Sequence, residues 1–133
     1  MNAEDLLEGA CHCGAVRLRL MVMPTSAVRC NCSICRRLAA VWADCRADRV
    51  QLQGHPESTE SYVWGDRSLR YVRCRHCGCT THWESLLPDV DPPHMCVNLR
   101  NFPATLLAQV ALRFFDGADS WSYQDSPDAR HWR

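Results

Sequence analysis

Hydrophobic and polar residues alternate along several short stretches of the chain, a pattern typical of half-buried β-strands. In the first of these stretches, Val16, Leu18 and Leu20 alternate with arginines. Gly65-Asp66 lies between two others, as a turn does between the strands of a hairpin. The stretches expected to form strands are residues 16–21, 50–53, 62–64, 69–73, 79–83 and 111–115.

Signals for helix are few. Ser33 is a candidate N-cap for a short helical turn over residues 34–38, and Pro103 precedes a second candidate over residues 104–111. Residues 86–94 contain three prolines and are expected to form a surface loop. These patterns predict a mainly β fold with antiparallel sheets and little helix.

The length of 133 residues suits a single domain, since typical domains contain ~100–200 residues. We expect one domain over residues 1–133, with its core at about 9–121 and a C-terminal tail at 122–133. Fifteen arginines balance fifteen acidic residues, so the zero net charge disfavours nucleic acid as a partner. The chain has no lysine, which excludes Schiff-base chemistry, pyridoxal phosphate anchoring and the Walker P-loop.

No membrane association is expected, because the longest apolar run, residues 38–43, is far shorter than the ~20 residues of a membrane span. The first eight residues are acidic and lack the apolar segment of a signal peptide. We therefore expect a cytoplasmic protein. Thiols stay reduced in that compartment, so the ten cysteines of the chain are better suited to metal ligation than to disulfides.

Four of the cysteines form two close pairs, a C-x-C pair at Cys11 and Cys13 and a C-x-x-C pair at Cys74 and Cys77. Glycine follows each pair and permits the positive φ that a tight zinc-knuckle turn needs. Two pairs supply the four thiolates of a closed tetrahedral zinc site, which is typical of structural zinc. The alternative is that these thiols are packed as small hydrophobic side chains.

A third group places Cys30, Cys32 and Cys35 within six residues. Three thiolates from one turn can cover one side of a metal and leave a fourth position for water or substrate, as catalytic zinc sites do. Arg36 and Arg37 follow directly, and their guanidinium groups could bind a substrate carboxylate through two hydrogen bonds. Their alternative role is to lie on a solvated helix face and pair with acidic residues.

Other interpretations of this group remain open. A fourth protein ligand from Cys45, Cys96 or His82 would make the site closed and structural. An iron–sulfur cluster would compete with zinc, although such clusters usually bind four cysteines. Cys79, like Cys45 and Cys96, matches no pair spacing and suits a buried apolar position.

In their order along the chain, these motifs resemble the glutathione-dependent formaldehyde-activating enzyme family, which also includes the centromere protein V-like proteins. The resemblance covers about residues 9–121, and it rests on C-H-C-G-A-V-R at 11–17, C-N-C-S-I-C-R at 30–36, C-R-H-C-G at 74–78 and F-D-G-A-D-S-W at 115–121. It implies a fold of several coiled antiparallel β-sheets.

The resemblance also implies two zinc ions per chain. One is a structural zinc on Cys11, Cys13, Cys74 and Cys77, and the other is a catalytic zinc on Cys30, Cys32 and Cys35. The implied activity is that of a carbon–sulfur lyase, with glutathione joined to formaldehyde as S-hydroxymethylglutathione.

The leading hypothesis is therefore an enzyme that binds a small thiol, glutathione or an analogue, and forms or cleaves its adduct with a small aldehyde. The metal would stabilise the thiolate form of the thiol. A non-catalytic zinc-stabilised binding module of the centromere protein V-like type is the alternative. A metal or redox sensor that uses the exposed cysteines is a third hypothesis.

Overall fold

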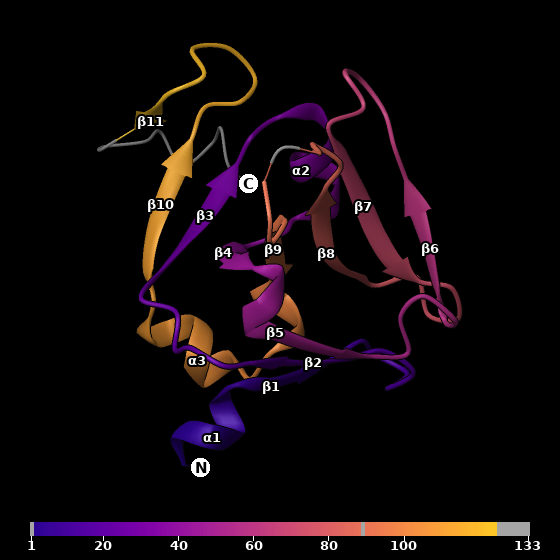
Figure 1. Ribbon diagram of the computed structural model, residues 1–133. Helices are drawn as coiled ribbons and strands as arrows, with labels where there is room; N and C mark the ends of the chain where they lie inside the picture. Colours follow the sequence, from indigo (N-terminus) through magenta and orange to yellow (C-terminus); the bar gives the residue numbers. More distant parts are fainter. Residues whose placement is uncertain (1, 89, 125–133) are drawn as a thin grey trace.

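The computed structural model describes residues 2–88 and 90–124, and these form two β-sheets with short helices (Figure 1). The smaller sheet has three antiparallel strands in the order β1-β2-β5. Their bounds are Glu8–Ala10, Arg17–Leu20 and Val50–Gln53. In Figure 1 this sheet lies below the larger one, next to the N-terminus.

The larger sheet has eight strands in the order β11-β10-β3-β4-β9-β8-β7-β6. Neighbouring strands in this sheet are antiparallel, except that β10 runs parallel to β3. Phe115, the last residue of β10, lies opposite Cys30, the last residue of β3. Parallel strands end at the same edge of a sheet, so the segments that follow β3 and β10 leave it side by side. Bounds are β3 Ser26–Cys30, β4 Trp42–Arg46, β6 Thr59–Tyr62, β7 Leu69–Cys74, β8 Thr80–Ser85, β9 His94–Asn98, β10 Ala111–Phe115 and β11 Tyr123–Gln124.

The helices are short and lie in the connections. The helix over Ser33–Leu38 overlaps the predicted helical turn. Its N-cap is Cys32 and not Ser33, because the backbone is already helical at Ser33. The α-helices are α1 Ala3–Leu6, α2 Ser33–Leu38 and α3 Ala104–Gln109, and the 3-10 helices are η1 Ala47–Arg49 and η2 Leu99–Asn101.

The main hydrophobic core lies between the two sheets. Leu18 and Leu20 of β2 are buried, while the arginines between them are exposed. They belong to one cluster with Val97 of β9, Leu99 of η2 and Leu106 of α3. Burial of such side chains stabilises the contact by about 1.5–3 kcal/mol for each one. The core therefore joins the small sheet, β9 and α3 into one body.

The predicted mainly β fold is confirmed, and each predicted strand overlaps one in the structure. The predicted surface loop is shorter than expected, since β9 already begins at His94. In the predicted tail, Tyr123 and Gln124 pair with β10, and residues 125–133 lie outside the described part of the chain. None of the helices in the described ranges has the length and apolar content to cross a bilayer.

Candidate metal centres and the adjoining cavity

Two turns from different sheets bring the two cysteine pairs together. Cys11 and Cys13 lie in the turn between β1 and β2, and Cys74 and Cys77 lie at the turn between β7 and β8. Gly14 and Gly78 follow the pairs with φ of 81° and 79°. The backbone N–H groups of Gly14 and Gly78 donate to the carbonyl oxygens of Cys11 and Cys74. These four cysteines, the four-cysteine group, are therefore held by two tight turns.

The geometry of the four-cysteine group fits a tetrahedral metal. The Sγ atom of Cys13 lies 3.7 Å from that of Cys11 and 3.6 Å from that of Cys74. Zinc–sulfur bonds of about 2.3 Å place tetrahedral thiolates about 3.8 Å apart. Cys11 and Cys74 are buried, and each Sγ accepts a backbone N–H bond, from Val16 and His76. This donor set is compatible with zinc.

The third group of cysteines, Cys30, Cys32 and Cys35, is called here the cysteine triad. Cys30 ends β3, Cys32 caps α2, and Cys35 lies in its first turn. Their Sγ atoms lie within 4.8 Å of one another. Because β3 is followed directly by α2, one short segment supplies all three sulfur atoms, as the spacing predicts.

Local hydrogen bonds stabilise negative charge in the triad. Hydrogen bonds from the Cys30 and Cys35 thiols, together with the backbone N–H groups of Cys35 and Ile34, lower the pKa of Cys32 to about 2. Sharing of protons with Cys30 and Cys32 raises the pKa of Cys35. The indole Nε1–H of Trp42 donates to Cys35 Sγ over 3.3 Å. These hydrogen bonds favour a thiolate at Cys32.

Cys32 lines a cavity of about 740 Å³, called here the triad cavity. Arg36 of α2 and Tyr71 of β7 also line it. Two tryptophans, Trp64 and Trp121, supply large apolar surfaces. The other lining residues are Asn31, Ser33, Gly65, Asp66, Ser68, Leu69, Gly117 and Ala118.

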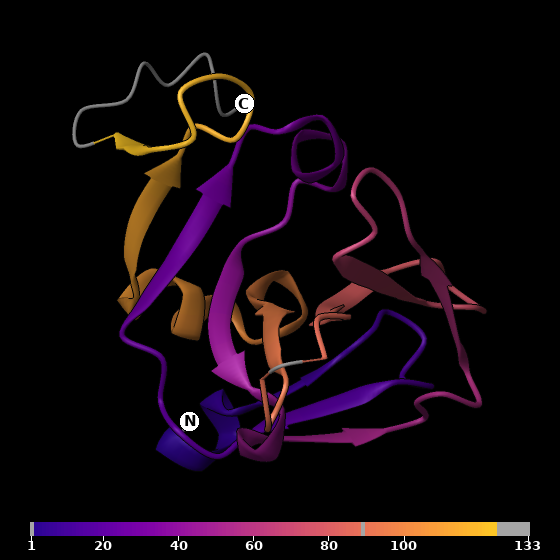
Figure 2. The same ribbon diagram turned by 45° about the horizontal axis from the view of Figure 1, so that its top comes forward.

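The segment between β10 and β11 closes one side of the triad cavity. Figure 2 shows it beside the segment that connects β3 to α2. Asn31 joins the two segments: its Nδ2 donates to Asp116 Oδ1 over 3.0 Å, and its Oδ1 accepts from the backbone N–H of Ala118 over 3.0 Å. A Cβ atom at Gly117 would lie 2.7 Å from Cys30 Sγ, so the backbone here passes directly over the triad.

The two arginines after the triad differ in position. Arg36 lines the triad cavity. Arg37 donates from its guanidinium group to the carbonyl oxygen of Ser33 over 2.8 Å and is not among the lining residues.

The three residues considered as a fourth triad ligand lie in other groups. The Cys45 thiol donates to the carbonyl oxygen of Ala43, and burial raises the pKa of Cys45 to about 11. Cys96 groups with Asp44 and His94, and His82 groups with His55 and Glu84. Within the described residues, the triad therefore has three cysteines as its metal-ligating set.

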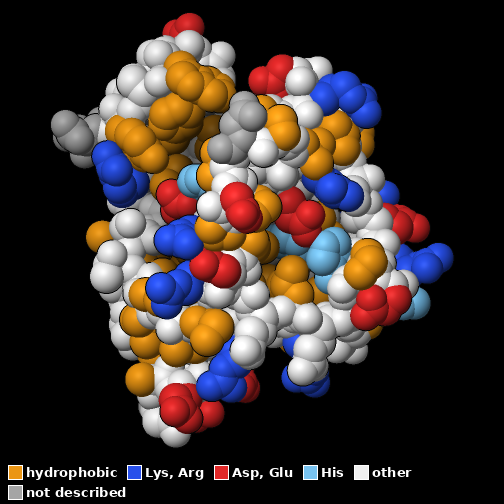
Figure 3. All heavy atoms as spheres, in the orientation of Figure 1, with side chains coloured by type: hydrophobic (Ala, Val, Ile, Leu, Met, Phe, Trp, Pro, Cys, Tyr) orange, Lys and Arg blue, Asp and Glu red, His pale blue; other side chains and the backbone are white. Residues whose placement is uncertain are grey.

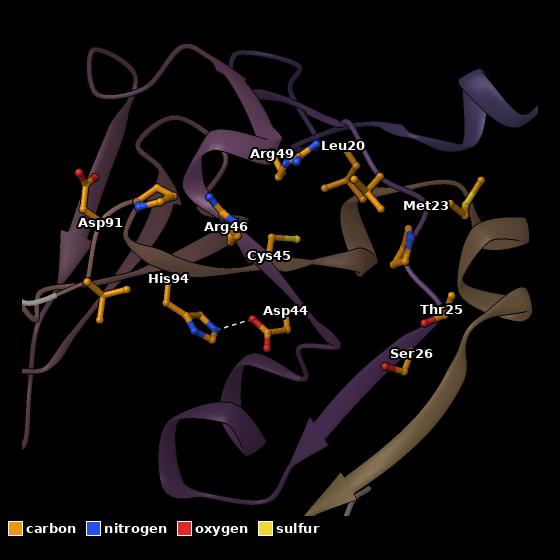
Figure 4. Close-up of a pocket in the computed structure, with 14 residues that line it drawn as sticks. Leu20, Met23, Thr25, Ser26, Asp44, Cys45, Arg46, Arg49, Asp91 and His94 are labelled. Atoms are coloured by element: carbon orange, nitrogen blue, oxygen red, sulfur yellow. Dashed lines mark ion pairs between the residues drawn. The ribbon is translucent and has the colours of Figure 1, made fainter.

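A second cavity, of about 730 Å³, lies away from the clustered cysteines (Figure 4). Its polar wall carries the ion pair of His94 and Asp44, with Arg46 and Arg49 nearby, and Cys45 is its only cysteine among the described residues. Met23 and Leu20 are part of an apolar wall opposite. The triad cavity is the better candidate site, because it alone of the two contains a residue of a cysteine cluster.

Sequence reasoning found the cysteines but missed the residues that complete the site. Asn31 lies inside the C-N-C motif, and Gly117 lies inside the F-D-G-A-D-S-W segment, so those motifs carry a signal for both. The spacing of residues along the chain does not indicate that Trp42 bonds to Cys35 or that Tyr71 lines the same cavity as Cys32. These placements arise from the pairing of strands far apart in the chain.

Comparison with known proteins places this arrangement in a family. The family model described as glutathione-dependent formaldehyde-activating enzyme matches residues 6–113. A protein of Halomonas elongata, provisionally named a glutathione-dependent formaldehyde-activating enzyme, is 60% identical over 35 residues. That alignment covers 26% of this chain and 22% of the relative, so the chain matches about a fifth of the relative's length.

A solved structure supports the same placement. The crystal structure of a Rhodobacter sphaeroides protein superposes with a TM-score of 0.62 at 32% sequence identity. The superposition covers 79% of this chain and 98% of the Rhodobacter chain. The family model spans most of the chain and includes all seven clustered cysteines. The chain therefore belongs to the glutathione-dependent formaldehyde-activating enzyme family.

Proposed function

We propose that this protein is a zinc-dependent carbon–sulfur lyase, which binds a small thiol in the triad cavity and forms or cleaves the adduct of that thiol with a small aldehyde. One observation carries the proposal: Cys32 of the cysteine triad lines the same cavity as Arg36. The family to which the chain belongs supports glutathione and formaldehyde as the substrates.

The residues fit two zinc ions with different roles. The four-cysteine group would hold a structural ion, and Cys30, Cys32 and Cys35 would hold a catalytic one. When bound, the catalytic zinc supplies a Lewis acid that stabilises the thiolate form of the substrate thiol. Three soft thiolate ligands favour zinc over harder cations such as magnesium.

The residues of the chain would orient the substrates. Arg36 would bind a carboxylate of the thiol substrate through two parallel hydrogen bonds. Arg37, which donates to Ser33, would support the same helix face and add positive charge beside the cavity. The rings of Trp64 and Trp121 would cover the apolar part of the substrate and exclude water from the reacting atoms.

The reaction would be an addition. The sulfur of the thiol forms a bond to the carbonyl carbon of the aldehyde, and the proton lost by the thiol passes to the carbonyl oxygen. The hydroxyl of Tyr71, in the wall of the cavity, would donate a hydrogen bond to that oxygen. In the reverse direction the carbon–sulfur bond breaks and the same proton returns to sulfur.

Adduct formation can be followed by NMR with glutathione and ¹³C-labelled formaldehyde. We expect the protein to accelerate exchange between free formaldehyde and S-hydroxymethylglutathione above the rate without protein. Arg36→Gln should lower kcat/KM by about tenfold to a hundredfold, the loss expected for a charged hydrogen bond of about 1.5–3 kcal/mol. Arg37→Gln is the matched control and should lower it less.

Cys32→Ser should abolish the acceleration while the protein remains folded. If the wild-type protein leaves the exchange rate unchanged, the enzyme proposal is wrong, and a zinc-stabilised binding module becomes the better description. An equal loss in Arg36→Gln and Arg37→Gln would contradict the role of the cavity-lining guanidinium group.

A further inference from the structure

A second cluster of metal-ligating side chains lies apart from the cysteines. His82 and Glu84 lie on β8, and His55 lies in the turn that follows β5, so the cluster joins the two sheets. His55 Nε2 is 2.6 Å and His82 Nε2 is 2.7 Å from the same oxygen, Glu84 Oε1. Figure 3 shows histidine side chains beside acidic ones over the region of β7 and β8.

The outer nitrogen of each imidazole ring is held by a threonine. His55 Nδ1 lies 2.7 Å from Thr59 Oγ1, and His82 Nδ1 lies 2.8 Å from Thr81 Oγ1. Both hydroxyls have a backbone carbonyl as acceptor: Thr59 donates to the carbonyl of Pro56 and Thr81 to that of Val72.

The direction of each threonine hydroxyl decides which nitrogen of the neighbouring imidazole ring carries the proton. Each hydroxyl has one proton, and once it is donated to the carbonyl, the hydroxyl oxygen can only accept. Nδ1 then carries the proton of each neutral ring, and Nε2 carries a lone pair. In this tautomer the two Nε2 atoms and Glu84 Oε1 present lone pairs to one another, an arrangement that a divalent cation satisfies. In the other tautomer each Nε2–H donates to Glu84 Oε1 instead.

We propose that His55, His82 and Glu84 form a third metal site, which binds a divalent zinc-type ion through the two Nε2 atoms and Glu84 Oε1. Two histidines and one glutamate are a known ligand set of zinc, and three protein ligands leave one position for water. The Nδ1–H bonds to threonine match the hydrogen bonds that orient histidine ligands in metal sites.

The surroundings of the three side chains are compatible with a bound metal ion. His82 is fully buried. Arg70 Nε lies 3.7 Å from Glu84 Oε2, so this cation faces the other carboxylate oxygen and leaves Oε1 to the metal. A tetrahedral zinc ion holds its nitrogen and oxygen ligands about 3.3 Å apart. Metal binding would therefore move the partly exposed His55 and Glu84 side chains outward by about 0.6 Å.

The probe for this site is Co²⁺, added to protein whose cysteine sites are already filled with zinc. We expect one additional equivalent to bind and to produce a visible d–d band without the charge-transfer bands of thiolate–cobalt bonds. His55→Gln and Glu84→Gln should each lose this band. His94→Gln removes a histidine from the separate Asp44 group and should keep it. His82 is left unchanged, because it is fully buried.

A second measurement is independent of colour. Added Zn²⁺ should raise the Tm of the zinc-filled wild-type protein and of His94→Gln, but not that of His55→Gln. The proposal is overturned if the first bound cobalt shows thiolate charge transfer, if no cobalt binds, or if His55→Gln and Glu84→Gln retain the band. Because no substrate is used, these outcomes do not depend on the proposed enzyme activity.

Discussion

The cysteine groups could be predicted from the sequence, because each set of neighbouring cysteines comes from one short turn. Spacing alone marks Cys30, Cys32 and Cys35 as one group. The contacts that enclose this triad could not be predicted in the same way. Gly117 approaches Cys30, and Trp42 bonds to Cys35, only after β3 has paired with β10 and β4. Such neighbours depend on strand order, which periodicity does not reveal.

Gly117→Ala tests the close passage over the triad. The new Cβ would lie 2.7 Å from Cys30 Sγ and 3.1 Å from Cys32 Cβ, so one of the segments must move. Overpacking of this kind costs about 1–3 kcal/mol, which corresponds to about five- to 150-fold weaker metal binding by the triad. Cobalt titration of the triad measures this change.

Ala118→Ser is the matched control for that substitution. Ala118 is exposed and bonds to Asn31 through its backbone, which the substitution preserves. We expect its cobalt affinity to equal that of the wild type. Unchanged affinity in Gly117→Ala would contradict the steric argument.

Among the strands, β2 was predictable and β9 was not. In β2, exposed and buried residues alternate along the strand, and the same alternation in the sequence predicts a strand over residues 16–21. In β9, by contrast, four consecutive residues from Met95 to Asn98 are buried, so no alternation exists there to detect. The parallel pairing of β10 with β3 is also a property of the whole sheet.

The turn after β5 depends on a glycine. Gly54 has φ of +84°, and a Cβ atom there would lie 2.0 Å from the carbonyl oxygen of Ala15. Gly54→Ala must therefore bear backbone strain and displace the neighbouring turn, and we expect a loss of about 3 kcal/mol in the free energy of unfolding. Urea denaturation measures this loss.

Gly65→Ala separates the two causes. Gly65 also has a positive φ, of +62°, but nothing lies within 4 Å of its Cβ position. Only backbone strain applies, and the expected loss is about 1–2 kcal/mol. Equal losses in the two variants would show that the close approach to Ala15 does not contribute.

The four-cysteine group connects parts of the fold that the hydrophobic core joins elsewhere. Cys11 and Cys13 belong to the small sheet, whereas Cys74 and Cys77 belong to the large one. Val16 and the buried cysteines form a small separate cluster around this group. The triad, in contrast, uses one continuous segment and joins no sheets. A metal in the first site would therefore constrain the whole molecule, and a metal in the second would constrain one turn.

Substitution of one cysteine in each site tests this difference. Bound structural zinc contributes roughly 10–16 kcal/mol of apparent free energy, and the total stability of a domain is about 5–15 kcal/mol. Cys74→Ser removes a fully buried cysteine of the group that a metal would use to connect the two sheets, so we expect that variant to unfold or aggregate. Cys32→Ser changes a half-buried cysteine at the wall of the triad cavity and should remain folded with less bound zinc. Thermal unfolding by circular dichroism, together with zinc analysis, compares the two variants. Equal Tm values would show that the four-cysteine group has no special role in stability. A folded Cys32→Ser beside an unfolded Cys74→Ser would assign a structural role to the four-cysteine group and leave the triad free for chemistry.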